Sequence, residues 1–132
     1  YSQLLKVKKI QKIRKKNWDI FKKLIDKLNT EKFYLVKGNN KSTSAYHILA
    51  LVFRSTMLAN KFKEFIQNKK IAATFHYVPL HKSKMGIKFC KYKLPITENI
   101  YSRIVRLPLF SEMKKKEIDK ISLLIKTFTL KF

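Results

Sequence analysis

One continuous apolar segment limits the folds open to this chain more than any other feature. Residues 45–53, AYHILALVF, are rich in strand-forming side chains and lie between the polar Ser44 and the charged Arg54. The segment is much shorter than the roughly 18 apolar residues that a membrane span requires. Its length and sharp ends are typical of a buried strand. The sequence therefore predicts a sheet that contains this strand.

Helical periodicity surrounds this segment. Residues 3–28 carry apolar side chains at steps of three and four, with lysines on the opposite face and no Gly or Pro. The pattern predicts one helix of roughly 39 Å. Such a helix is longer than a domain of this size needs, so it is either an amphipathic bundle helix or a connector to something outside the chain. Three further helices are expected after Ser or Thr caps: 57–68 after Ser55 or Thr56, 98–102 after Thr97, and 114–128 after Ser111.

Two shorter apolar runs complete the expected sheet. Residues 71–75 and 104–110 are predicted as strands, and Pro108 places the latter at an edge or gives it an irregular end. Residues 29–44 and 82–96 are polar or lysine-rich and are expected as loops. The order of elements predicts an α+β domain. Its small antiparallel or mixed sheet of about three strands has helices packed on one face and is preceded by the long helix.

The composition is that of one small, strongly basic domain. The chain has 132 residues and a formal net charge of +23, but only four of its 31 basic side chains are arginine. Arginine is the residue that grips phosphates and bases with a planar fork. The lysine excess therefore favours solvated faces and compositional bias over specific nucleic-acid recognition. A lysine-rich module that binds RNA or anionic surfaces stays open as the alternative function.

The single cysteine, Cys90, excludes an internal disulfide and suits a reducing compartment. No apolar leader segment follows the basic start, so we expect a cytoplasmic protein without a membrane span. The first residue is Tyr1 rather than methionine, as expected for a fragment, a processed product or a cloned piece of a longer protein.

The heptapeptide FHYVPLH, residues 75–81, is the densest cluster of chemically versatile side chains. His76 and His81 could bind zinc together with His47 and Cys90, but their spacing matches no zinc motif, and we predict no metal site. No nucleophile elbow or glycine-rich phosphate loop is present, so we assign no catalytic residue. Taken alone, a strand-end histidine bonded to the backbone remains the simplest interpretation of His76.

Four segments in order resemble the DegT/DnrJ/EryC1/StrS family of sugar-nucleotide aminotransferases. The most specific are H-Y-x-P-L-H at 76–81 and R-L-P-L-F at 106–110, within the longer segments SAYHILALVF, KKIAATFHYVPLHKSKMG and LPITENIYSRIVRLPLF and before the closing helix. The resemblance covers nearly the whole chain. It is strongest to members that aminate a dTDP-4-keto-6-deoxyhexose for enterobacterial common antigen, a lipopolysaccharide-type polymer.

The resemblance implies the small C-terminal domain of a fold type I enzyme that uses pyridoxal phosphate to transfer an amino group from glutamate. Residues 1–30 would be a connector helix and residues 31–132 the small α+β domain. The family's Schiff-base lysine, phosphate cradle and cofactor aspartate belong to a large domain that is absent from this sequence. We therefore expect homodimers and pyridoxal phosphate only for the complete enzyme, and neither cofactor nor activity for this chain alone.

The resemblance also implies that the heptapeptide borders the cleft between the two domains. Its side chains would donate hydrogen bonds to the hydroxyls or the diphosphate of a nucleotide sugar, with Arg106 as a charge partner or, equally, as a structural arginine. Lys82 and Lys84 would add attraction for the diphosphate, unless they are ordinary solvated lysines. The expected substrate-binding residues are His76, Tyr77, His81 and Arg106, and no residue is assigned to cofactor or metal.

Overall fold

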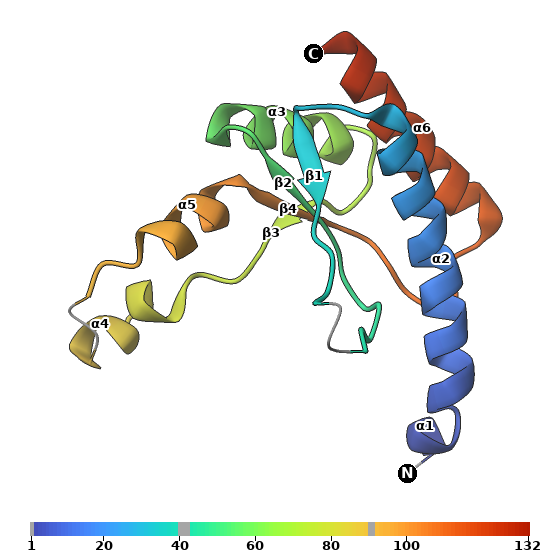
Figure 1. Cartoon of the computed structure of the whole chain (residues 1–132), viewed down its shortest axis with the longest axis horizontal. Helices are drawn as coiled ribbons and strands as arrows, with labels where there is room; N and C mark the ends of the chain where they lie inside the picture. The colour runs from blue at the N-terminus through green and yellow to red at the C-terminus, as the bar shows by residue number, and fades with distance from the viewer. Residues whose placement is uncertain (1, 40–42, 90–91) are drawn as a thin grey trace.

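The computed structural model describes residues 2–39, 43–89 and 92–132. The described chain forms an antiparallel sheet with the strand order β1-β2-β4-β3 (Figure 1). This confirms the α+β class, but the sheet has four strands rather than about three. The strands are β1 (Phe33–Leu35), β2 (Leu49–Phe53), β3 (Thr74–Phe75) and β4 (Ile104–Leu107).

The apolar run forms the inner strand β2, as predicted, and all five of its residues are buried. β2 pairs with β1 on one side, where Phe33 faces Phe53, and with β4 on the other, where Leu49 faces Leu107. The strand starts at Leu49 rather than at residue 45. The backbone of Tyr46 has a φ of 46°, which is outside the extended range that a strand requires.

The other strand predictions were wrong in extent. β1 lies in a segment expected to be a loop, because the four residues between Lys32 and Lys37 are too few to show a period. β3 begins at Thr74 rather than at residue 71. β4 is an inner strand between β2 and β3, so the edge position considered for it was wrong. It ends at Leu107 because the following Pro108 has no backbone N–H to donate to a partner strand.

The helices follow the predicted positions, with different boundaries. The predicted helix 3–28 is divided in two at Lys6, which keeps near-helical angles of −98° and 0° but ends the first turn. The segment 82–96, expected as a loop, contains a short helix and the beginning of another. The helices are α1 (Ser2–Leu5), α2 (Val7–Leu28), α3 (Thr56–Gln67), α4 (Gly86–Phe89), α5 (Pro95–Arg103) and α6 (Lys115–Lys131), with a 3-10 turn η1 (Leu80–Lys82).

Of the helix caps predicted from the sequence, only the one before α3 was correct. Ser55 caps α3, since its Oγ accepts the Leu58 N–H at 3.2 Å. The Thr97 cap was wrong because α5 starts earlier, with Pro95 in its first turn. The Ser111 cap was also wrong. The carboxylate of Glu117 instead accepts the N–H of the residue before α6 at 2.6 Å.

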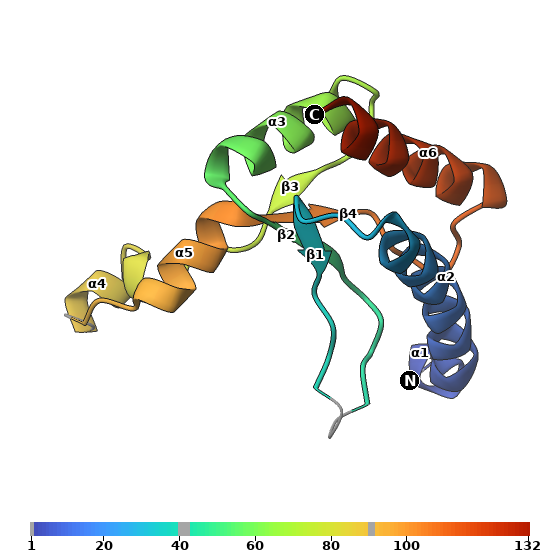
Figure 2. The same ribbon diagram turned by 45° about the horizontal axis from the view of Figure 1, so that its top comes forward.

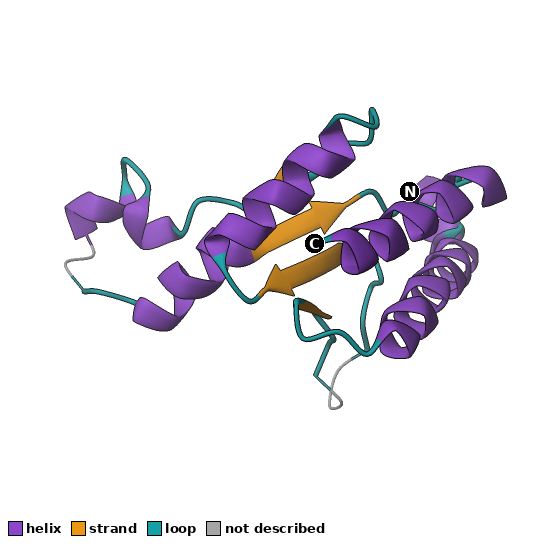
Figure 3. Cartoon of the chain, turned by 90° about the horizontal axis from the view of Figure 1, so that it is seen from above, coloured by secondary structure: helices purple, strands orange, loops and turns teal. Residues whose placement is uncertain are grey.

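α3 and α6 cover one face of the sheet, and α2 lies beside α6 (Figures 2 and 3). Aromatic rings fill the space beneath the two covering helices. The ring of Phe62 lies 4.9 Å, between centroids, from the rings of both Phe53 and Phe128. Phe21 and Ile25 of α2 join the same core. The core is therefore one layer between the sheet and its helices.

The segment from η1 to α5 extends away from the sheet as an arm (Figure 1). A Cβ at Gly86 would lie 1.6 Å from the carbonyl oxygen of Leu80, so only glycine fits where α4 meets η1. Many large apolar side chains of this arm are exposed: Leu80, Met85, Ile87, Phe89, Tyr92 and Ile96. None of the described helices is long and apolar enough to cross a lipid bilayer.

Candidate functional site

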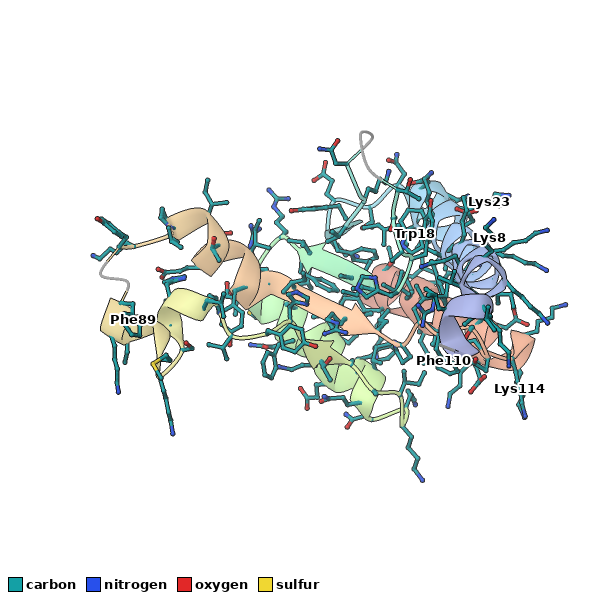
Figure 4. The ribbon with its side chains drawn as sticks, turned by 90° about the horizontal axis from the view of Figure 1, so that it is seen from below. Lys8, Trp18, Lys23, Phe89, Phe110 and Lys114 are labelled. Carbon is teal, nitrogen blue, oxygen red and sulfur yellow. The ribbon has the colours of Figure 1, made fainter. Side chains whose placement is uncertain are left out.

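The second face of the sheet differs from the first because no described helix packs across it as α3 and α6 do, and α2 and α5 contribute only side chains at its margins (Figure 4). Side chains alternate between the two faces along a strand. Leu49, Leu51 and Phe53 point to the helices, so Ala50 lies on the open face. Ala50 is paired with Arg106 of β4, which in turn is paired with Thr74 of β3. Arg106 therefore lies between two small neighbours near the middle of the open face.

The same alternation brings His76 to Arg106. Phe75 is paired with Val105 of the core face, so the next residue, His76, returns to the face of Arg106. The rings of His76 and Tyr77 are 5.2 Å apart, and the guanidinium carbon of Arg106 lies 5.4 Å from the centre of the Tyr77 ring. The structure thus brings together His76, Tyr77 and Arg106, three of the four predicted site residues.

This group keeps unused hydrogen-bonding capacity. Burial, and secondarily the charge of Arg106, lowers the pKa of His76 below its usual 6.5, so the neutral imidazole is favoured. The Nδ1 atom of His76 is buried without a hydrogen-bond partner among the described residues. Within the same residues, no carboxylate pairs with Arg106. A guanidinium and an imidazole without partners can bind the oxygens of an anionic or hydroxylated ligand.

His81 lies elsewhere. It belongs to η1, and its Nε2 is 3.2 Å from a carboxylate oxygen of Glu98 in α5. Lys82 binds the other oxygen of that carboxylate at 2.6 Å. Lys82 and then His81 are the main causes that lower the pKa of Glu98 to about 2. The side chain of His81 is only 8% exposed, so in this structure it joins the turn η1 to α5, while Lys84 is exposed on the arm.

Two cavities meet at His76. The Tyr77 cavity, of about 560 Å³, lies between the heptapeptide and α5 and is lined mainly by Tyr77, Val78, Leu80, Ile96, Ile100 and Tyr101. The Trp18 cavity, of about 250 Å³, lies between α2 and the β1–β2 connection. It is lined by Trp18, Val36, Lys37, Gly38, Ser44, His47, Ile48 and Ala50. His76 and Ile104 line both cavities. The open face therefore carries two neighbouring cavities that share His76 and Ile104 in their walls.

The Trp18 cavity was not predicted from the sequence. Trp18 sits where the apolar period of residues 3–28 is interrupted, and this interruption was the only available signal. Lys37 and Ser44 were part of an expected loop, and His47 was considered only as a metal ligand. Among the described residues no three His, Cys, Asp or Glu side chains converge as metal ligands, and Cys90 lies outside the described residues.

The described residues do not suit covalent binding of pyridoxal phosphate. A Schiff-base lysine has to stand in a sheltered cavity, with its pKa lowered by burial or neighbouring charge. Asn17 is the one buried polar or charged residue in the described ranges, so no described lysine is buried. Lys37, which lines the Trp18 cavity, is exposed and lies 3.4 Å from Asp26. No step through this cofactor is therefore derived from this chain's residues.

Comparison with known proteins decides the family. Residues 1–126 match the sequence profile of the DegT/DnrJ/EryC1/StrS aminotransferase family. The chain belongs to this family. A curated member, dTDP-3-amino-3,6-dideoxy-alpha-D-galactopyranose transaminase of Aneurinibacillus thermoaerophilus, is 30% identical over 61 residues. The matched segment is 46% of this chain and 17% of that enzyme.

Solved structures of sugar aminotransferases share the fold of this family member. PseC of Helicobacter pylori, an aminotransferase involved in the biosynthesis of pseudoaminic acid, has a TM-score of 0.84 at 18% identity and matches 99% of this chain. A DegT DnrJ EryC1 StrS aminotransferase from Brucella abortus has a TM-score of 0.80 at 18% identity and matches 97%. The match covers only 36% and 33% of those two proteins. The chain thus spans about a third of their length.

Proposed function

We propose that this chain is the small C-terminal domain of a sugar-nucleotide transaminase that depends on pyridoxal phosphate. Residues 1–30 connect it to a large domain that carries the cofactor, and residues 31–132 form one wall of the nucleotide-sugar site. Membership of an aminotransferase family supports this function over a lysine-rich module that binds RNA or anionic surfaces. A single cysteine among 132 residues is in keeping with a reducing, cytoplasmic location.

One observation carries the proposal. His76 lines both cavities, Tyr77 lines one of them, and the guanidinium of Arg106 lies over the Tyr77 ring, beside the cavities rather than in their walls. Arginine binds phosphate oxygens with two parallel hydrogen bonds. The group therefore suits the diphosphate of a nucleotide sugar. His81 contributes indirectly, since its contact with Glu98 holds the end of the heptapeptide against α5.

The proposed reaction transfers an amino group from glutamate to a dTDP-4-keto-6-deoxyhexose, the step that enterobacterial common antigen requires. The name of the curated relative places the amino group at position 3 of its sugar rather than at position 4. The position is thus a separate question from the reaction class. Regiochemistry of the product, determined by NMR, distinguishes the two positions.

The chain alone should not catalyse this reaction. Exchange of a ketone for an amine needs the electron sink that pyridoxal phosphate supplies, and the described lysines offer no sheltered attachment point. The complete enzyme is expected to be a homodimer in which a large domain closes over the open face of the sheet.

The test is to co-express the chain with the large domain of a family member and to assay amino transfer from glutamate. We expect the pair to bind the cofactor, seen by its absorbance, and to turn over the keto sugar, while the 132-residue chain does neither. Arg106→Ala in the pair should raise KM for the nucleotide sugar by about tenfold or more, with kcat retained. The matched control Arg54→Ala changes an arginine that is 74% exposed and should leave KM unchanged. Equal KM values for both variants would overturn the proposed site.

A further inference from the structure

The carboxylate of Glu98 connects two segments of the arm. Glu98 lies in the first turn of α5. One of its oxygens lies 3.2 Å from Nε2 of His81 and accepts the backbone N–H of Leu94 at 3.3 Å, and the other lies 2.6 Å from Nζ of Lys82. His81 and Lys82 belong to η1. A single side chain therefore joins η1 to the beginning of α5.

The two segments that Glu98 joins carry the two walls of the Tyr77 cavity. One wall is formed by residues 76–80, which follow the last residue of β3 and lead directly into His81. The other wall comes from α5, through the side chains of Ile96, Thr97, Ile100 and Tyr101. Glu98 itself lines neither cavity. It therefore fixes the distance between the walls from outside the cavity.

The beginning of α5 depends on this attachment more than its end does. At the end of the helix, the guanidinium of Arg103 donates to the carbonyl oxygens of Phe53 and Arg54 at 3.1 and 3.2 Å. At the beginning, Ile96 is 76% exposed, so packing holds it only weakly. Within the described part of the chain, every polar side-chain contact between residues 75–82 and α5 ends on Glu98.

We infer that Glu98 is a positioning residue of the nucleotide-sugar site, which fixes the wall that carries His76 and Tyr77 without contacting the ligand. This inference rests on the proposed function and deepens it. The chemistry of the contacts requires a carboxylate, because both of its oxygens accept hydrogen bonds. A glutamine in its place would replace one acceptor by a donor, which would face donors of the neighbouring segments and leave Lys82 without a charge partner.

The first experiment follows the arm in the 132-residue chain. Glu98→Gln is compared with the matched control Glu64→Gln, which removes a carboxylate from the exposed surface of α3. Hydrogen exchange is measured at the amides of Ser83 and of residue 98, which donate to the carbonyl oxygens of Leu80 and Leu94. Both amides should exchange about tenfold faster in Glu98→Gln, while those of β2 should not change, since the arm loosens locally. The control should leave all of them unchanged.

The second experiment measures kinetics in the co-expressed pair described above. Glu98→Gln should raise KM for the nucleotide sugar by about fivefold and leave kcat and the cofactor absorbance unchanged, because only the wall of the binding site is displaced. Glu98→Asp keeps the charge on a side chain that is one methylene shorter, so it should raise KM less. Glu64→Gln should change neither constant.

Lys82 tests whether the contact with Glu98 is the cause. Lys82→Gln alone should raise KM less than Glu98→Gln does, because His81 keeps its partner. The double variant should match Glu98→Gln alone, since two residues that act through the same contact are not additive. Additive effects would show that Lys82 attracts the diphosphate directly, and they would contradict the positioning role of Glu98.

The other outcomes separate this inference from the proposed function. If the parent pair does not turn over the keto sugar, the proposed function fails, and Glu98 has no site to position. If the parent is active and Glu98→Gln has the same KM, the inference fails alone. If hydrogen exchange is faster throughout the chain, or if kcat falls while KM is unchanged, Glu98 supports the fold or the reaction rather than the binding site, and the inference is wrong.

Discussion

The two faces of the sheet are built from the same strands but have different roles: one stabilises the fold, and the other is available to a ligand. On the helix-covered face, Leu49, Leu51 and Phe53 have no measurable exposure and pack beneath α3 and α6. On the open face, the residues between and beside them include Ala50 and Arg106, and the latter is only half-buried. Because side chains alternate between the two faces of the sheet, neighbouring residues of one strand can have different roles. One stabilises the fold and the next is available to a ligand.

The two faces also differ in how much they contribute to the stability of the fold. Apolar burial stabilises the covered face by roughly 25 cal/mol per Å² of surface removed from water. The open face instead keeps a guanidinium without a carboxylate partner and a buried imidazole nitrogen without a hydrogen bond, among the residues that the structure describes. A buried nitrogen without a hydrogen bond costs stability, whereas a guanidinium without a carboxylate partner can still bind an anionic ligand. Substitutions on the covered face should therefore unfold the chain, and substitutions of the half-buried His76 or Arg106 on the open face should spare it.

The largest effect is expected from Phe62→Ala on the covered side. Phe62 has no exposed surface and contacts the rings of Phe53 and Phe128. Its loss should lower the free energy of unfolding by about 3–5 kcal/mol, a large fraction of a small domain's stability. Urea denaturation followed by circular dichroism measures this. The control Phe89→Ala, on the arm where the ring is 82% exposed, should stay within about 0.5 kcal/mol of the parent.

A smaller loss is expected where α2 is joined to the chain after β4. Asn17 is buried, and its side-chain amide donates to the carbonyl oxygen of Phe110 at 3.2 Å. Asn17→Ala should lower the free energy of unfolding by about 1–3 kcal/mol, because a hydrogen bond inside the protein is lost. Asn60→Ala on the exposed surface of α3 is the control. The same urea denaturation for both variants would contradict a structural role for Asn17.

Acid should loosen the arm rather than the core. The pKa of Glu98 falls from its usual 4.5 to about 2, first because of Lys82 and then because of His81. A depressed carboxyl pKa contributes stability that is present above pH 4.5 and is lost as the pH falls through about 2. Glu98→Gln should abolish this pH-dependent contribution to stability. The test is to measure the melting temperatures of the parent and of Glu98→Gln between pH 5 and pH 2. If both melting temperatures fall equally with pH, the Glu98 contacts do not form in solution.

The smallest effect on stability is expected from Arg106→Leu, which should change the free energy of unfolding by about 0.5 kcal/mol or less. The same change should raise the pKa of His76, because a nearby positive charge is removed while burial continues to lower it. NMR titration of the imidazole measures the shift. As long as the pKa of His76 remains depressed, its stabilising contribution is present above pH 6.5 and is lost at lower pH. A strong loss of stability in Arg106→Leu would contradict the claim that Arg106 on the open face contributes little to folding stability.

Several features were predictable because they depend on neighbouring residues. The apolar run placed β2, Ser55 placed the beginning of α3, and the order of the motifs indicated the family. The heptapeptide was correctly expected at the end of a strand. His81 could not be placed, because its partner Glu98 lies 17 positions away across a turn that carries no sequence signal.

Periodicity, capping and motif order are local properties of a chain, and they were enough to predict a buried strand at β2, the approximate positions of the longer helices and the family. Which residues share the open face and line its two cavities depends on contacts between distant segments. Trp18, Ser44, His76 and Arg106 come from four separate segments, and only the register of the strands and the packing of α2 bring them together. The left-handed backbone of Tyr46 and the three-residue strand β1 were likewise not predictable from the sequence, because long-range contacts outweigh weak local preferences at both places.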